Sequence, residues 1–114
     1  MKYLLLIYEN EAHYAGEAGE ALLKDVVAGH MAFTEALEAA GVAWSGSELA
    51  PTATAATVSG DGVVHDGPFA ETHEQLGGYY MIDVADRDAA VAWARRIPLA
   101  PGGKVEVRPT GPNC

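Results

Sequence analysis

The residues best suited to chemistry lie in one short stretch, residues 66 to 80, which combines turn formers, carboxylates, a histidine and aromatic side chains. Asp66-Gly67-Pro68 predicts a turn, because Asp accepts backbone N–H bonds, Gly turns freely and Pro fixes φ. Loops held by a rigid scaffold commonly carry catalytic and binding residues. The stretch therefore indicates a site, although it does not name a reaction.

His30 is the second candidate. It falls on the apolar stripe of a predicted helix, where Leu22, Val26, Phe33 and Leu37 follow at spacings of three or four residues. A half-buried imidazole near a carboxylate is a natural proton shuttle. The alternative is a core histidine that hydrogen-bonds to backbone, since buried polar groups usually have structural partners.

The enzymatic hypothesis makes His30 a general acid or base that Asp66 orients, in proton-transfer chemistry such as elimination or isomerisation of a small organic molecule. The substrate contacts would then come from Pro68, Phe69, Glu71, Thr72 and Tyr80. Asp66 could instead only close its own turn, Phe69 could be a core anchor, and Glu71 a solvated carboxylate. A non-catalytic binding or regulatory module is the alternative function.

We expect neither a metal nor a cofactor. His65, Asp66, Glu71 and His73 offer nitrogen and oxygen ligands, but their spacing matches no metal motif, and the first two point to opposite faces of a strand end. Gly77-Gly78 precedes a strand, so no helix N-terminus awaits a phosphate. Close backbone approach in a sheet, or a bulge, explains these glycines better.

The bulk composition limits the possible partners. The 114 residues suit one domain, and the net charge of −9 opposes binding to nucleic acid and to anionic lipid. The single cysteine, Cys114, cannot form an intramolecular disulfide, which fits the cytoplasm. The apolar start, residues 1 to 8, is too short for a signal peptide and predicts a strand, and no segment approaches the roughly 20 apolar residues that span a bilayer.

The predicted elements follow an order that suits an α+β fold. Strands are expected at 2–8, 42–49, 78–84 and 104–108, helices at 19–40 and from the Asp86 cap to Ile97, and a hairpin at 54–59 and 63–66. Residues 1–109 would form the domain and 110–114 a loose tail. This order is typical of a ferredoxin-like split βαβ sheet with both helices on one face and an extra hairpin.

The other face of that sheet would then lack a cover. The strand at 2–8 is apolar on both sides, while Tyr79 and Met81 point away from Tyr80 and Ile82. Leaving such a surface in water costs about 25 cal/mol per Å². We therefore expect a homodimer that packs sheet against sheet, the alternative being that the extra hairpin folds over its own sheet.

The residues already described also carry a resemblance. The segment Asp66-Gly67-Pro68-Phe69-Ala70-Glu71-Thr72, followed by residues 74–80, resembles the signature of the DGPF-type proteins of the YCII-related family. The start at residues 1–8 and the segments 93–98 and 105–109 are also similar to that family. His73 stands where the family usually carries Lys, which weakens any role for a cation there.

The resemblance implies a ferredoxin-like fold that dimerises into an α+β barrel, and a His–Asp pair in the cleft, matched here by His30 and Asp66. A similar relative is a dehydrochlorinase that acts on a chlorinated hydroxyquinol. Many DGPF-type members are encoded near extracytoplasmic-function sigma factors, which implies a regulatory setting as the alternative.

Overall fold

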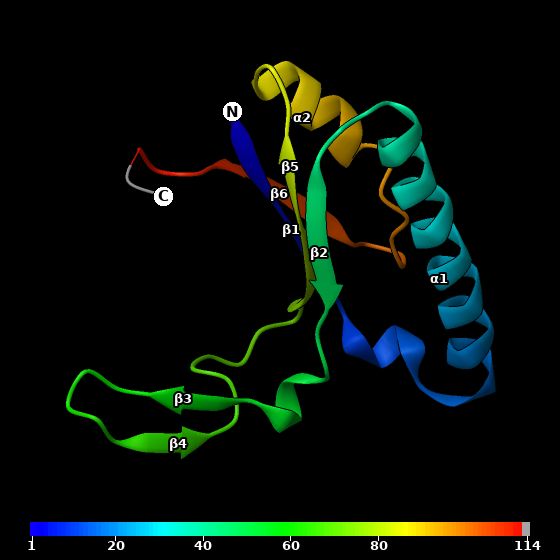
Figure 1. The fold of residues 1–114 in the computed structure, drawn as a ribbon. Coiled ribbons are helices and arrows are strands. Elements are labelled where there is room, and N and C mark those ends of the chain that lie inside the picture. The colour runs from blue at the N-terminus through cyan, green and yellow to red at the C-terminus, as the bar shows by residue number, and fades with distance from the viewer. Residues whose placement is uncertain (113–114) are drawn as a thin grey trace.

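Strand β1 (Lys2–Glu9) occupies the middle of the sheet, and its side chains alternate between two environments. Tyr3, Leu5 and Ile7 are buried, while Leu4 and Leu6 keep part of their surface exposed. In the computed structural model, which describes residues 1–112, β1 belongs to a four-stranded antiparallel sheet of order β2-β5-β1-β6. The other strands are β2 (Trp44–Glu48), β5 (Gln75–Asp83) and β6 (Lys104–Pro109). The result is the α+β order of split βαβ units that the sequence predicts (Figure 1).

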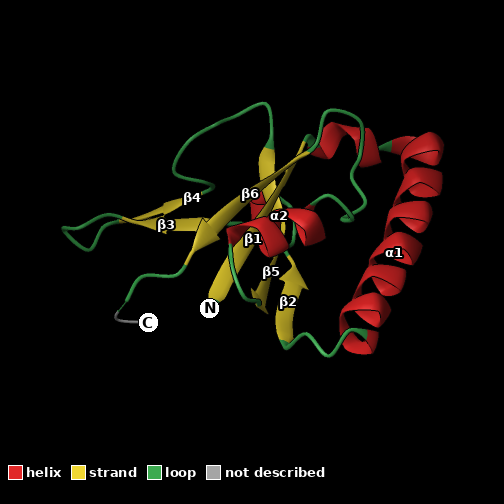
Figure 2. Cartoon of the chain, turned by 90° about the horizontal axis from the view of Figure 1, so that it is seen from above, coloured by secondary structure: helices red, strands yellow, loops and turns green. Residues whose placement is uncertain are grey.

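Helices α1 (Gly16–Ala39) and α2 (Arg87–Ala94) lie on one side of this sheet (Figures 1 and 2). The predicted stripe of α1 is confirmed, because Val26, Phe33 and Leu37 are buried and His30 is half-buried. α1 ends at a Schellman-type turn, in which Gly41 has φ +71° and the Val42 N–H bonds to the Leu37 carbonyl at 2.9 Å. The helix stripe and the inner face of the sheet together form the core.

α1 begins earlier than the predicted start at residue 19. The residues between the predicted strand at 2–8 and this start have regular structure, because β1 runs to Glu9, a 3-10 turn η1 covers Glu11–Tyr14, and α1 starts at Gly16. Gly19 allows this compact entry, since a Cβ there would lie 2.1 Å from the carbonyl carbon of Tyr14. The sequence pattern did not predict the early start of α1, because that start depends on the close approach of the Gly19 and Tyr14 backbones.

β5 also starts earlier than the predicted residue 78. Its register against β1 pairs Ile7 with Gly78 but Tyr8 with Leu76, which leaves Gly77 as the extra residue of a bulge. The bulge that Gly77-Gly78 predicts is therefore confirmed, and it lets the strand continue back to Gln75.

α2 begins as expected and ends sooner. The Asp86 carboxylate accepts a hydrogen bond from the Ala89 N–H at 2.9 Å, which confirms the predicted N-cap. The regular helix stops at Ala94 and not at Ile97, so that Arg95 and Arg96 lie in the turns beyond it. The side chain of Ile97 is nonetheless buried.

The extra hairpin forms an arm, which we define as residues 55–67. Its strands β3 (Ala56–Val58) and β4 (Val64–Asp66) pair with each other and follow a short 3-10 turn η2 (Thr52–Thr54). The arm projects beyond the side of the sheet opposite α1 and does not lie over that sheet face (Figures 1 and 2). The alternative in which the hairpin covers its own sheet is therefore wrong.

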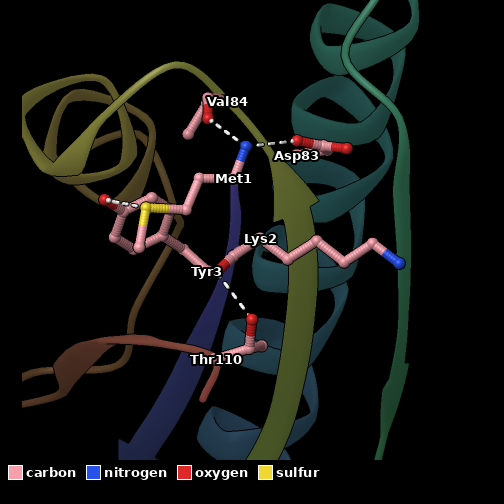
Figure 3. Close-up of polar contacts among 6 residues, drawn as sticks. All are labelled: Met1, Lys2, Tyr3, Asp83, Val84 and Thr110. Atoms are coloured by element: carbon pink, nitrogen blue, oxygen red, sulfur yellow. Dashed lines mark hydrogen bonds and ion pairs between the residues drawn. The ribbon is translucent and has the colours of Figure 1, made fainter. Parts of the chain in front are cut away.

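Polar contacts hold Met1 and Thr110 near the start of β1. The N-terminal ammonium lies 2.9 Å from Asp83 and also donates to the Val84 carbonyl, and the Thr110 hydroxyl donates to the Lys2 carbonyl at 3.3 Å (Figure 3). The Thr110 N–H donates to the same carbonyl at 3.1 Å. Thr110, which the sequence assigns to the loose tail, is thus held to β1. Cys114, the last residue of that predicted tail, lies outside the described residues.

Candidate functional site

A cavity of about 350 Å³ opens between α1 and the β2–β5 side of the sheet. Each neighbouring element contributes a chemically capable side chain to its lining. His30 comes from α1, Tyr80 from β5, Trp44 and Glu48 from β2, and Glu9 from the end of β1. This is the place where the structure concentrates groups that can donate, accept or stabilise a proton.

His30 and Tyr80 form the central contact of this cavity. Nδ1 of His30 lies 2.6 Å from the Tyr80 hydroxyl oxygen, which is a short hydrogen bond between an imidazole and a phenol. The Tyr80 ring packs against Phe33 at 4.9 Å and meets Trp44 edge-on at 5.9 Å between ring centroids. These contacts fix the direction of the hydroxyl, so the pair is preorganised.

Burial controls the protonation of this pair. Desolvation lowers the pKa of His30, and it outweighs the nearby carboxylates of Glu9 and Glu48, which act to raise it. Burial also raises the pKa of the Tyr80 phenol. Both groups are therefore neutral near pH 7, and the second ring nitrogen of His30 has no hydrogen-bond partner among residues 1–112.

Glu9 is a buried carboxylate that sequence reasoning missed, with a residue exposure of 9%. It accepts hydrogen bonds from the Tyr14 hydroxyl at 2.7 Å and from the Ala100 N–H. Burial, followed by this bond to Glu9, raises the pKa of Tyr14. A signal for Glu9 existed, because the alternation Tyr3, Leu5, Ile7 carries on to residue 9 on the helix-covered face.

Sequence reasoning missed Glu48 as well and assigned no role to Gly46. Gly46 instead has a packing role, because a Cβ there would lie 2.7 Å from a ring carbon of Tyr80. Two residues along β2, exposed Glu48 pairs in register with Gly78, which has no side chain. The two glycines leave room for Tyr80 and for the cavity beside Glu48.

The structure does not bring Asp66 to His30 within one chain. Asp66 is exposed at the end of β4, it does not line the cavity, and its carboxylate makes no hydrogen bond in the described part of the chain. The partner of His30 is Tyr80 and not a carboxylate. The two proposed catalytic residues thus lie on different parts of the molecule, one in the body and one on the arm.

The residues expected to contact substrate divide into three groups. Tyr80 shares the cavity with His30. Pro68, Phe69 and Thr72 line a second hollow of about 600 Å³ at the base of the arm, where Phe69 is 89% exposed. Glu71 is exposed and lines neither hollow.

The described residues offer no cluster of three or more His, Cys, Asp or Glu side chains that could hold a metal ion. Within the same residues, no helix combines the length and the apolar character needed to cross a bilayer.

Comparison with known proteins identifies the class to which this fold and site belong. Residues 1–112 match the YCII-related domain. The chain is also 39% identical over 117 residues to an uncharacterized protein of Rhizobium meliloti (strain 1021), which covers 96% of this chain and 91% of that protein. The chain belongs to the YCII-related family.

Proposed function

We propose that this YCII-related protein catalyses proton transfer on a small organic molecule bound in the cavity between α1 and the sheet. His30 acts as the general acid and base, and Tyr80 holds it through the hydrogen bond to Nδ1. The supporting observation is the 2.6 Å contact between His30 Nδ1 and the Tyr80 hydroxyl in a cavity of about 350 Å³. That volume suits a ligand built on a single ring.

The chemistry follows from the protonation states. Neutral His30 takes a proton from a carbon or hydroxyl of the substrate through its free nitrogen, and the imidazolium that forms donates from Nδ1 to the Tyr80 oxygen. The carboxylates of Glu9 and Glu48 stabilise that cation. In an elimination, the electrons of the broken C–H bond form a double bond as the leaving group departs with its own pair. In an isomerisation, the imidazolium returns the proton to another carbon.

A second candidate is a non-catalytic module that binds a small molecule and serves regulation. One observation favours it, because no carboxylate hydrogen-bonds to His30 among residues 1–112, so the expected His–Asp centre is not formed in one chain. The cavity is common to both candidates, and only turnover separates them.

The experiment that separates them combines binding and isotope exchange. Small ring compounds that raise the melting temperature are incubated with the protein in D₂O, and NMR follows deuterium entering their C–H positions. We expect exchange that His30→Gln and Tyr80→Phe reduce, while His65→Gln on the arm leaves it unchanged. Binding to the cavity with no exchange for any bound compound supports the second candidate and overturns catalysis.

We propose further that the protein works as a homodimer joined through the open face of the sheet, the face without helices. Strand register and alternation place six partly exposed apolar side chains on it: Leu4, Leu6, Tyr8, Leu76, Tyr79 and Met81. Such a contiguous apolar surface supports burial against another protein surface.

Charge favours a second copy as the occupant of the open face. The charged side chains that share this face by register are three cations and two anions: Lys2, Lys104, Arg108, Asp83 and Glu106. Since the whole chain carries −9, a face with one more cation than anions lowers the repulsion between two copies that meet there.

The arm extends past that face and carries apolar side chains of its own. Val58 and Val64 are 65% and 61% exposed. In a two-fold dimer built on the open face, each arm lies beside the partner subunit. The arm would then add contact area to the dimer interface without packing against the sheet of its own chain.

A further inference from the structure

We propose that the cavity between α1 and the sheet selects small organic cations, amines with an apolar body, over neutral and anionic molecules of the same shape. This inference rests on the proposed function, because it names the class of ligand for the same cavity. The supporting observations are the charged and aromatic side chains that line the cavity.

The cavity lining is anionic. Its charged side chains are the carboxylates Glu9 and Glu48, and none of its described lining residues is Lys or Arg. The carboxylates are close enough for both to act on the pKa of His30, so they face the same space as the imidazole. Neutral His30 supplies no counter-charge for an anion.

The two carboxylates differ in whether they can accept a hydrogen bond from a ligand. Glu9 is buried and already accepts from Tyr14 and Ala100, so it acts as a fixed negative charge in the wall. Glu48 is exposed at the end of β2, and its carboxylate makes no hydrogen bond within residues 1–112. It stands opposite Gly78, where no side chain blocks an incoming donor. An ammonium N–H therefore has an open acceptor at the mouth of the cavity.

The rest of the lining suits the body of such a ligand. Trp44 and Tyr80 present aromatic rings, which attract a cation placed over their faces. Ile7, Val27 and Met31 add apolar surface from the sheet and from α1. An aromatic or aliphatic amine would fill this space, whereas a carboxylate would meet two like charges in a chain of net charge −9.

The test uses three probes of similar size: benzylamine, benzyl alcohol and benzoate. Each is titrated into the full-length protein near pH 7.5, with the His30 ring signals, assigned by comparison with His30→Gln, as the readout. We expect saturable shifts with benzylamine, an affinity about fivefold lower for benzyl alcohol, which is the effect of one partly exposed ion pair, and no saturation with benzoate. A bound ammonium should also lower the pKa of His30 further, because like charges repel.

The matched variants are Glu48→Gln, which keeps size and hydrogen bonding, and Glu35→Gln on the exposed side of α1. Glu48→Gln should weaken benzylamine binding severalfold, towards the affinity of benzyl alcohol, and leave the alcohol unchanged, while Glu35→Gln should change neither. If Glu48→Gln leaves benzylamine binding intact, or if benzoate binds as tightly as benzylamine, the selectivity for cations is overturned while the cavity stays a binding site. If no probe shifts the His30 signals, the selectivity fails and the proposed function loses its support as well.

Discussion

The hydroxyl of Tyr80 lies 2.6 Å from Nδ1 of His30, although the two residues are 50 positions apart in the chain. The register of β5 against β1 and β2 places Tyr80 on the helix-covered face, and the stripe of α1 places His30 above it. The contact is therefore a product of the whole sheet, and its energy can be measured separately from catalysis.

A double-mutant cycle should detect this contact as coupling. Tyr80→Phe leaves the half-buried Nδ1 of His30 without its partner, which should lower the free energy of unfolding by about 1–3 kcal/mol. Combining it with His30→Gln should show a coupling of about 1 kcal/mol in urea unfolding. Tyr8→Phe on the open face is the control and should couple to neither change. Full additivity of the two substitutions would contradict the contact.

The depressed pKa of His30 should make stability depend on pH in a defined direction. In the unfolded chain the pKa of this histidine is about 6.5, so it becomes protonated below that pH. In the folded chain its lowered pKa keeps the ring neutral to a lower pH. The free energy of unfolding should therefore fall as pH drops from about 6.5 towards the lower folded pKa, with no contribution above that range. Urea titrations from pH 5 to 7.5 should show a steeper fall for the native protein than for His30→Gln, and parallel curves would contradict the desolvated imidazole.

Replacing Gly19 by alanine tests the packing of η1 on α1. Alanine ordinarily stabilises a helix interior relative to glycine by about 1 kcal/mol, but here its Cβ would lie 2.1 Å from the Tyr14 backbone. We expect a net loss of stability of about 2 kcal/mol or more, measured by thermal and urea unfolding. At Gly77 a Cβ would have no neighbour within 4 Å, so Gly77→Ala is the milder comparison. An increase in stability for Gly19→Ala would show that the entry turn can move aside.

The open face of the sheet should govern association. Sedimentation equilibrium at micromolar concentration should give about twice the chain mass of 11.9 kDa. Leu6→Lys, at the middle of β1 on that face, should shift the protein towards 11.9 kDa, since it would place a charged group in the apolar interface. Leu23→Lys on the exposed side of α1 should leave the mass unchanged. A native protein that sediments as a single chain would overturn the dimer.

The sequence predicted the elements well where a pattern is local. The strand at β1, the stripe of α1 and the Asp86 cap all follow from neighbours a few residues apart, and each is confirmed. The early start of α1 was missed because it depends on the close approach of Gly19 to Tyr14.

The site was predicted only in part. His30 and Tyr80 could each be placed on the inner side of the domain, but their pairing depends on strand register and helix rotation, which local patterns do not determine. Glu9 was not among the predicted site residues, although extending the side-chain alternation of β1 to residue 9 places it on the helix-covered face. Asp66 belongs to a turn whose chemistry is clear locally, but the arm carries that turn away from the body.

The base of the arm is closed by its own hydrogen bonds. The Gly67 N–H bonds to the Ala55 carbonyl at 2.6 Å, and the Thr57 hydroxyl donates to the Gly67 carbonyl at 2.8 Å. A segment whose two ends already meet can grow, shrink or change composition without shifting the strands that flank it. The proposed contact between two copies can therefore change while the cavity under α1 keeps its shape.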